Sequence, residues 1–399
     1  MRWVGRRTCV CTPTTFRGDT PRYSALKIRR LVRLLTITLL LSGTARAAEI
    51  HVDDDAAPLG DGASWATAYR CLQDAIAVAV PGDVIRVAQG VYVPDETEAQ
   101  PDGTGDRTAS FVMATGVIWE GGYQGLGGGD PDERDIAGYV TTLSGDLLGD
   151  DAPAFANRGD NSYHVVIGTG VNLSAIIDGM TIRSGNADGP PPWHNLGGGL
   201  LCRPGSPTVR ECTFIDNLVG NLGHGGGMAS DRDIGEGGSP LIIDCSFIGN
   251  RADYNGGGLY NFRSRTVVVD CHFEGNSVVL ADGNKGGAMM NDEGAVVVLC
   301  STFVNNHADE IGGGIYAANG ATTLRDCLVL SNTSIGPGGG VHTLNDDTKI
   351  CDTVICGNTP DEITGSYTDC GVNRIGPIGV DQFLELLAWW GECTLGPLE

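Results

Sequence analysis

Two short elements recur along the second half of the chain, and their spacing restricts the fold more than any other feature of the sequence. The first is a glycine cluster followed by an apolar residue, at Gly197–Leu200, Gly225–Met228, Gly256–Leu259, Gly286–Met289, Gly312–Ile315 and Gly338–Val341. The second is a short segment ending in asparagine, at Cys212–Asn217, Cys245–Asn250, Cys271–Asn276, Cys300–Asn306, Cys327–Asn332 and in a diverged copy ending at Asn358. The chain is therefore a tandem repeat.

The repeat length indicates the kind of unit. Successive terminal asparagines lie 33, 26, 30, 26 and 26 residues apart, which fits one coil of a β-solenoid. A helical repeat of this length would need two amphipathic helices per unit, and glycine triplets and β-branched runs interrupt every candidate window. Glycine contributes 61 of 399 residues, about twice the usual share, which agrees with many tight corners. The sequence predicts an all-β solenoid.

Alternation within each strand predicts which side chains face the interior. In the segment 243–247, Ile243, Cys245 and Phe247 are expected to point inward, and Asp244 and Ser246 outward; the segment 269–273 has the same pattern. Coils stacked about 4.8 Å apart would align cysteine on cysteine, phenylalanine on phenylalanine and asparagine on asparagine. Stacked asparagines can bond amide to amide, and corner glycines permit positive φ.

The cysteines fit the same pattern. Five of the thirteen recur once per coil and are expected to form a buried thiol ladder, namely Cys212, Cys245, Cys271, Cys300 and Cys327. Disulfides between neighbouring coils are geometrically possible but not required. Cys370 and Cys393 bracket the C-terminal segment and could form a disulfide there. A zinc site is not expected, because no Cys-x-x-Cys pair occurs and the histidines are few and scattered.

Helical periodicity is found only in the segments that flank the coils. Over residues 64–80, Leu72, Ile76 and Ala79 fall on one face, and an amphipathic helix here would cover the open end of the solenoid. Residues 84–87 are then expected to form the first strand. A second short amphipathic helix is expected over residues 381–391, ended by Gly391.

The N-terminus is typical of an export signal. Arg29, Arg30 and Arg33 precede an apolar run that is too short to span a bilayer, and the small residues around Arg46 suit cleavage. We therefore assign residues 1–47 to a signal peptide, 48–362 to the solenoid with its N-terminal cap, and 363–399 to a C-terminal tail. The formal charge of the whole chain is -23, and removal of residues 1–47, which hold ten basic residues and one acid, would make the mature chain more negative. Nucleic acid is therefore not an expected partner, and no membrane span is expected in the mature chain.

Several motifs extend this description to a family. Residues 50–360 resemble right-handed parallel β-helix proteins of the pectin-lyase-like superfamily, especially secreted members common in planctomycetes. The matching segments are 65–68, 72–76, 82–85, 90–92, 121–123, 143–146, 177–182 and the coils. The resemblance implies an exported right-handed β-helix, an extracellular or cell-surface location, and activity or binding toward polysaccharides.

The C-terminus resembles half of a dockerin module over residues 381–384 and 387–391. A dockerin loop supplies alternating Asp or Asn ligands for calcium, but Cys370, Val372 and Arg374 occupy those positions here. The tail is therefore expected to be either a degenerate docking module or a C-terminal cap.

Two acidic groups are the candidate ligand-binding residues. Glu211, Asp244, Asp270, Asp326 and Asp352 each lie six residues before a terminal asparagine and would form a column that could collect cations or bind basic partners. A solvated face that keeps the protein soluble explains the same column. A loop holding Asp146, Asp150 and Asp151, with Asp160, could bind Ca²⁺, although its spacing is not that of an EF-hand.

These residues do not indicate an enzyme. Lyases of the superfamily resembled need Ca²⁺ and a basic residue at the sugar, and hydrolases need paired carboxylates. No basic residue recurs beside the acidic column, and no histidine belongs to a triad motif. We expect no catalytic residues and no required cofactor, and predict a non-catalytic secreted or surface solenoid that binds carbohydrate, envelope or protein partners. The alternative is a polysaccharide lyase or glycoside hydrolase. A groove pairing carboxylates with a basic residue would favour the enzyme, and a flat face of Ser, Thr, Asn and Asp would favour the binder.

Overall fold

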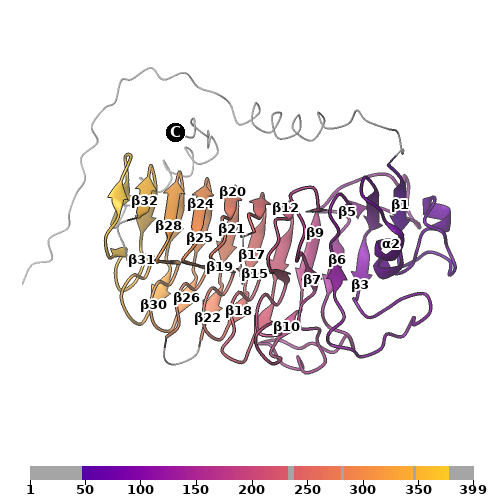
Figure 1. The fold of residues 1–399 in the computed structure, drawn as a ribbon, viewed down its shortest axis with the longest axis horizontal. Coiled ribbons are helices and arrows are strands. Elements are labelled where there is room, and N and C mark those ends of the chain that lie inside the picture. The colour runs from indigo at the N-terminus through magenta and orange to yellow at the C-terminus, as the bar shows by residue number, and fades with distance from the viewer. Residues whose placement is uncertain (1–46, 232–237, 280–282, 345–346, 377–399) are drawn as a thin grey trace, which may run out of the picture. The chain divides into compact units, whose positions relative to one another are not determined.

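The computed structural model describes residues 47–231, 238–279, 283–344 and 347–376, and it confirms the all-β right-handed parallel β-helix. Each regular coil passes in turn through four parallel sheets, which we call A, B, C and D. Successive coils pair strand on strand, so residues at one coil position stack along the helix (Figure 1).

Sheets A and B are the longest. Sheet A contains, in spatial order, β1 (Glu49–Val52), β2 (Val84–Ala88), β5 (Ile118–Tyr123), β8 (Ile176–Asp178), β12 (Thr208–Arg210), β16 (Leu241–Ile243), β20 (Val267–Val269), β24 (Ala295–Leu299), β28 (Ala321–Arg325), β32 (Thr348–Cys351) and β35 (Thr368–Asp369). Sheet B contains β3 (Gly90–Tyr92), β6 (Thr141–Ser144), β9 (Met180–Arg183), β13 (Thr213–Ile215), β17 (Ser246–Ile248), β21 (His272–Glu274), β25 (Thr302–Val304), β29 (Leu328–Leu330), β33 (Val354–Cys356) and β36 (Arg374–Ile375).

Sheets C and D complete each coil. Sheet C contains β10 (Asn186–Ala187), β14 (Leu218–Val219), β18 (Arg251–Ala252), β22 (Ser277–Val278), β26 (His307–Ala308) and β30 (Thr333–Ser334). Sheet D contains β4 (Phe111–Val112), β7 (Val166–Ile167), β11 (Leu200–Cys202), β15 (Met228–Asp231), β19 (Leu259–Phe262), β23 (Met289–Asp292), β27 (Ile315–Ala318), β31 (Val341–Thr343) and β34 (Ile363–Thr364). The glycine clusters precede the strands of sheet D.

The interior is built from ladders of identical residues. Phe214, Phe247, Phe273 and Phe303 stack with ring centroids 4.6–4.8 Å apart and nearly parallel planes. The terminal asparagines are buried and bond to one another from coil to coil, as the amide stacking predicted. Each therefore satisfies polar groups that would otherwise be buried without partners.

A left-handed residue lies at the corner between sheet A and sheet B, and this corner corrects the predicted orientation of the neighbouring side chains. Asp244 has φ 51°, and the strands on its two sides belong to different sheets. Alternation does not continue through such a corner, so Ile242 is fully buried, while Ile243 faces outward and is partly exposed. The prediction for Ile243 was wrong; those for Cys245 and Phe247 are confirmed.

The thiol ladder also needs one correction. Cys212, Cys245, Cys271 and Cys327 are buried free thiols at equivalent positions. Cys300 instead occupies the corner position, with φ 50°, and is disulfide-bonded. Ser301 takes the ladder position and bonds to the backbone N–H of Cys271 at 3.1 Å. Cys300 lies one residue farther from its terminal asparagine, Asn306, than the other cysteines lie from theirs. The ladder position therefore falls on the residue after Cys300.

The N-terminal end is closed by helix α2 (Leu72–Val78), preceded by a 3-10 turn η1 (Trp65–Thr67). Leu72 and Ala75 are buried against Ile50 and Val52 of β1, which confirms the capping helix within the predicted range 64–80. The expected first strand at residues 84–87 is β2, and β1 precedes it in both chain order and sheet order.

The ladders continue past residue 362, where we placed the start of the tail. Strands β34, β35 and β36 extend sheets D, A and B by one further pairing each. Cys370 forms a disulfide with Cys351 on the neighbouring coil, with Cα atoms 4.7 Å apart. The predicted Cys370–Cys393 pairing was therefore wrong, because strand pairing brings Cys351 beside Cys370. The export signal and the helix over 381–391 lie outside the described residues.

Within the residues that the structure describes, there is no helix long and apolar enough to cross a membrane.

Candidate functional site

The outer face of sheet B carries a row of five hydroxyl side chains and one histidine in register. One outward position is occupied on six successive strands by Thr142, Thr181, Thr213, Ser246, His272 and Thr302, each paired with the next across the sheet. All except Thr142 are partly exposed. Strands lie about 4.8 Å apart, so the row is about 24 Å long. We call these six residues the hydroxyl row.

The predicted acidic column borders this row, at the corner between sheets A and B. Glu211, Asp244, Asp270, Asp326 and Asp352 all have φ between 48° and 53°. They therefore lie on corners and not on a strand face, and Cys300 interrupts the column between Asp270 and Asp326. Asp tolerates the left-handed conformation better than most residues, because its short side chain can bond locally. The corner geometry alone therefore accounts for most of these acids.

Burial makes one pair in the column electrostatically unusual. Asp326 is partly buried, and desolvation, with a smaller contribution from the charge of Asp352, raises the pKa of Asp326 to about 6. Asp352 accepts a hydrogen bond from the backbone N–H of Val372 at 2.9 Å. The column therefore loses part of its negative charge in mildly acidic solution.

A cavity of about 440 Å³ opens beside the N-terminal part of sheet B. It is lined by residues 151–155 with Arg158, Arg183 and Asp216, and we call it the arginine pocket. Arg183 ends β9, two residues after Thr181, so the pocket adjoins the hydroxyl row. Pockets that bind small ligands have volumes of about 300–1,000 Å³, and this one lies in that range.

Ion pairs and strained backbone shape the arginine pocket. Arg158 is buried, its Nε lies 3.1 Å from an Asp151 carboxylate oxygen, and its Nη1 donates to the Asp216 carbonyl oxygen at 3.0 Å. Ala154, Phe155 and Asn157 all have φ of 60–61°. Non-glycine residues in this conformation cost about 1 kcal/mol or more each and are concentrated at ligand sites and switch regions.

Positive charge converges on this loop. The guanidinium of Arg158 lies 5.3 Å from the centroid of the Phe155 ring, and that of Arg251 lies 6.0 Å from it. Burial lowers the pKa of Arg158, and the nearby charge of Arg183 lowers it further, although Asp151 opposes both effects. Desolvation raises the pKa of Asp151. A buried arginine beside carboxylates is the arrangement that we expected of an enzyme groove.

The acidic loop suggested for calcium folds next to the pocket. Carboxylate oxygens of Asp146, Asp150 and Asp160 lie within 4.8 Å of one another. Asp151, the fourth predicted residue, is instead paired with Arg158 and bonded by Asn161. Asp146 already accepts hydrogen bonds from the backbone N–H groups of residues 150 and 151. The structure thus brings together three of the four residues, and backbone bonding alone can explain their approach.

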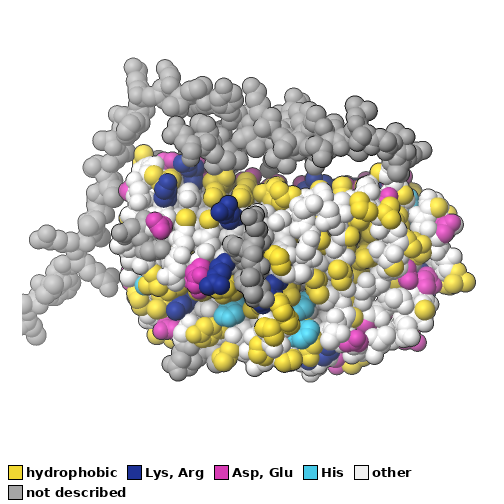
Figure 2. Space-filling model, viewed as in Figure 1, with side chains coloured by type: hydrophobic (Ala, Val, Ile, Leu, Met, Phe, Trp, Pro, Cys, Tyr) yellow, Lys and Arg dark blue, Asp and Glu magenta, His cyan; other side chains and the backbone are white. Residues whose placement is uncertain are grey.

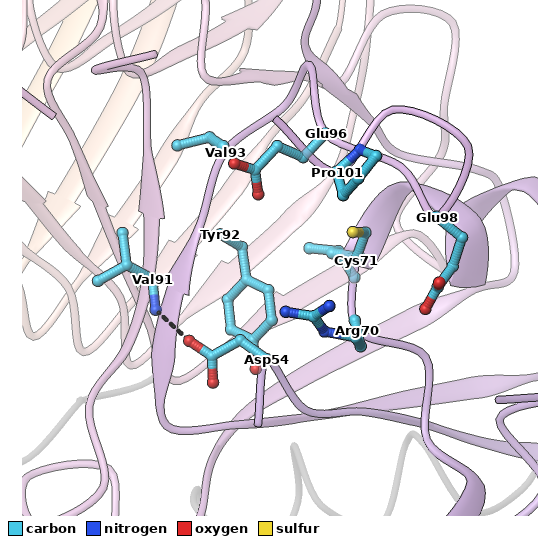
Figure 3. A pocket seen from close by; sticks show the side chains of 10 residues that line it. Asp54, Arg70, Cys71, Val91, Tyr92, Val93, Glu96, Glu98 and Pro101 are labelled. Carbon is cyan, nitrogen blue, oxygen red and sulfur yellow. Dashed lines mark hydrogen bonds between the residues drawn. The ribbon is translucent and has the colours of Figure 1, made fainter. Parts of the chain in front are cut away.

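A second cavity, of about 60 Å³, lies beside the N-terminal cap (Figure 3). Arg70, Tyr92, Asp54 and Glu96 line it, and Asp54 accepts a hydrogen bond from the backbone N–H of Val91 at 3.1 Å. Desolvation raises the pKa of both carboxylic acids. The cavity is too small for a sugar ring, because each water molecule in the liquid already occupies about 30 Å³.

Two histidines lie in hydrogen-bond chains that the sequence did not indicate. His307 bonds to Thr333 Oγ1 through Nδ1 at 2.8 Å and to Asp309 through Nε2 at 3.0 Å. His272 bonds in the same way to Thr302 and Glu274. Neither cavity described above includes these residues. A hydroxyl nucleophile also needs oxyanion donors, and the backbone N–H groups of Thr333 and Ser334 already bond within the ladder. We therefore give these chains a structural role.

Sequence reasoning located the acidic residues but missed the arginines. Arg158, Arg183 and Arg251 lie far apart in sequence and share no motif, and only the coil register and the loop over 151–158 bring them together. On the face drawn in Figure 2, acidic side chains occur in separate small groups, some of them beside Lys or Arg side chains.

One family comparison agrees with the fold. The family described as "Right handed beta helix region" matches residues 165–359. Among solved structures, pectate lyase Pel9A is 12% identical with a TM-score of 0.42 and covers 84% of this chain and 80% of its own. A rhamnogalacturonan lyase is 11% identical with a TM-score of 0.37, covering 84% and 87%. The pectin methylesterase from Aspergillus niger is 11% identical with a TM-score of 0.34, covering 89% and 98%. No curated protein sequence matches the chain.

Proposed function

We propose that this right-handed β-helix is an exported, non-catalytic protein that binds an extended polysaccharide along the outer face of sheet B. The observation that carries the proposal is the hydroxyl row, which presents Thr and Ser side chains in register on successive coils. Its spacing of about 4.8 Å is close to the length of one sugar unit in an extended glycan chain. Hydroxyl side chains both donate and accept hydrogen bonds, which suits a ligand rich in hydroxyl groups.

Flatness also supports binding over catalysis. The strands of sheet B pair without a register shift from β6 to β33. A regular surface recognises a regular chain. Cell-envelope proteins are a second class of partner that such a lateral face could take.

The experiment compares retention on a panel of immobilised neutral and acidic polysaccharides. Thr181→Val and Thr213→Val remove hydroxyls while keeping a β-branched side chain, and we expect each to weaken retention about fivefold or more. Thr323→Val on the outer face of sheet A is the matched control, because Thr323 is also partly exposed. Equal retention of all three variants and the unaltered protein would remove the support for the hydroxyl row.

A polysaccharide lyase or hydrolase is the second candidate, and the arginine pocket favours it. Arg158 lies beside Asp151, with its Nε 3.1 Å from a carboxylate oxygen, and this pairing of a buried basic residue with a carboxylate is the arrangement expected of a lyase or hydrolase groove. The same panel tests this, with unsaturated products and new reducing ends recorded in the presence of Ca²⁺ and of chelator. Calcium-dependent turnover that Arg158→Lys abolishes would replace the binding proposal.

We propose calcium as the cation for the acidic loop. Asp146, Asp150 and Asp160 offer three carboxylates, and hard oxygen ligands suit Ca²⁺. Titration calorimetry with Ca²⁺ on the unaltered protein and on Asp150→Asn would show a heat that the variant loses. Identical traces would assign the loop to backbone bonding alone.

A further inference from the structure

The connection from β10 to β11, residues 188–199, is longer than the other connections between sheets C and D. Its prolines at 190–192 have no backbone N–H to donate. Within the loop, the Gly189 N–H donates to the His194 carbonyl oxygen at 2.9 Å, and the His194 N–H donates to the Pro190 carbonyl oxygen at 3.4 Å. A loop without regular strand pairing depends on side-chain contacts to stay against the solenoid.

A stack of three rings supplies such contacts. His194 of the loop lies between Tyr163 and His164, which precede β7 in the neighbouring coil. The ring centroids of Tyr163 and His194 are 4.7 Å apart, and those of His164 and His194 are 5.7 Å apart with planes inclined by 22°. The loop is therefore attached to the solenoid partly through a pair of imidazoles.

Hydrogen bonding sets the protonation state of the inner imidazole. His164 is only 3% exposed, and its Nδ1 lies 3.1 Å from the carbonyl oxygen of Gly197. A carbonyl oxygen can only accept, so Nδ1 carries the hydrogen and Nε2 keeps its lone pair in the neutral ring. Within the described residues, this Nε2 is buried and has no hydrogen-bond partner.

We infer that residues 188–196 form an acid-sensitive loop, which opens when a proton from solvent binds Nε2 of His164. In the closed loop, this proton would place a charge and an N–H without an acceptor in a buried site beside a second imidazole. Opening returns water to the ring and removes both penalties. The inference concerns conformation and does not depend on glycan binding along the hydroxyl row.

The charged groups around the ring do not offset these penalties. Arg107 lies with its guanidinium 4.5 Å from the centroid of the Tyr163 ring, and Asp188 is paired with this arginine at 2.6 Å. His224, on the next coil, bonds through Nδ1 to the Asn255 amide nitrogen at 3.1 Å. Within the described part of the chain, no carboxylate pairs with His164.

The direction of the pH dependence follows from this burial. Burial lowers the pKa of His164 to about 4, and the charge of His194 contributes, although hydrogen bonding to the backbone of Gly197 and Leu196 opposes both effects. With the loop open, the ring regains its ordinary value of 6.5. Below that value the open state binds a proton that the closed state does not, so opening becomes more favourable as pH falls towards 4. Linkage gives about a thirtyfold increase in the ratio of open to closed loop between pH 7.5 and pH 5.

The test is hydrogen exchange on the full chain at these two pH values, expressed as protection factors that correct for the intrinsic exchange rate at each pH. The amides of Gly189 and His194 report on the loop, and those of β13 report on the rest of the fold. We expect protection in the loop to fall about thirtyfold at pH 5 and protection on β13 to stay unchanged. His164→Gln keeps an N–H for the Gly197 carbonyl group but does not titrate, so its loop should show no pH dependence. His307→Gln, a partly exposed site on sheet C, is the matched control and should behave as the unaltered protein does.

Three outcomes would overturn the inference. Unchanged protection of the loop in the unaltered protein would mean that it does not open with acid. An equal fall in His164→Gln would assign the effect to another group, such as His224. A parallel fall on β13 would be acid unfolding of the whole solenoid. If His164→Gln does not fold, NMR titration of the His164 Cε1–H signal in the unaltered protein decides: a midpoint near 4 supports the inference, and one near 6.5 rejects it.

Discussion

The side-chain amide of Asn250 donates to Asn276 Oδ1 at 2.9 Å, and the backbone N–H of Asn250 donates to the same oxygen at 3.0 Å. Asn276 in turn donates to the Phe247 carbonyl oxygen and to Asn306, so each asparagine is satisfied by the coils on both sides. This ladder holds the register between sheets B and C, where the chain turns without a long strand.

Removing one member should therefore affect several buried groups at once. We expect Asn276→Ala to lower the free energy of unfolding by about 3 kcal/mol or more, because it leaves donors and acceptors buried without partners. Urea unfolding measures this loss. The exposed Asn172 is the control, and its replacement by alanine should cost less than about 1 kcal/mol. Equal effects at both sites would contradict a structural role for the ladder.

The raised pKa of Asp326 predicts that this residue destabilises the folded protein to an extent that depends on pH. Its pKa in the folded protein is about 6, against the ordinary value of 3.8 for an aspartic acid. Between these values the folded state keeps a proton that the unfolded state releases, so the contribution of this residue to stability falls as pH rises through that window. Asp326→Asn should add about 1–2 kcal/mol at pH 8 and almost nothing near pH 4. Equal gains at both pH values would contradict this explanation.

The corner conformation predicts which substitutions the acidic column tolerates. Glu211 has φ 52°. We expect Glu211→Asn and Glu211→Gly to preserve stability, and Glu211→Val to lose about 1–2 kcal/mol, because a β-branched side chain disfavours the left-handed region. Thermal unfolding ranks the three variants. If Glu211→Val is as stable as Glu211→Gly, the corner does not select its residue by conformation.

The Cys351–Cys370 disulfide predicts a local effect at the last described coil. The bond closes a loop with a sequence separation of 19 residues. Cys370→Ser should therefore cost about 3 kcal/mol in the chain-entropy estimate. Hydrogen exchange should increase over residues 363–376 and stay unchanged around β9. Cys71→Ser alters a free, partly exposed thiol and serves as the control. Faster exchange throughout the solenoid would mean that the disulfide supports the whole fold.

Periodicity in the sequence was sufficient for the fold class, the phenylalanine and asparagine ladders and the capping helix. These features depend on local spacing, since stacking repeats the same contacts in every coil. Periodicity did not predict which side chains near Asp244 point inward, or which coil position Cys300 occupies. One left-handed residue changes the direction of all side chains that follow it in the coil.

The amino-acid sequence by itself determined that this protein is a β-solenoid whose coils repeat one set of buried residues, because period and alternation are properties of the chain alone. Only the tertiary structure decided which residues meet at the candidate site. The hydroxyl row needs the register of six strands, and the arginine pocket needs a strained loop to bring Arg158 beside Arg183 and Arg251. Such contacts between distant coils leave no periodic trace, since each residue occurs once and its partner is fixed by how the loop packs.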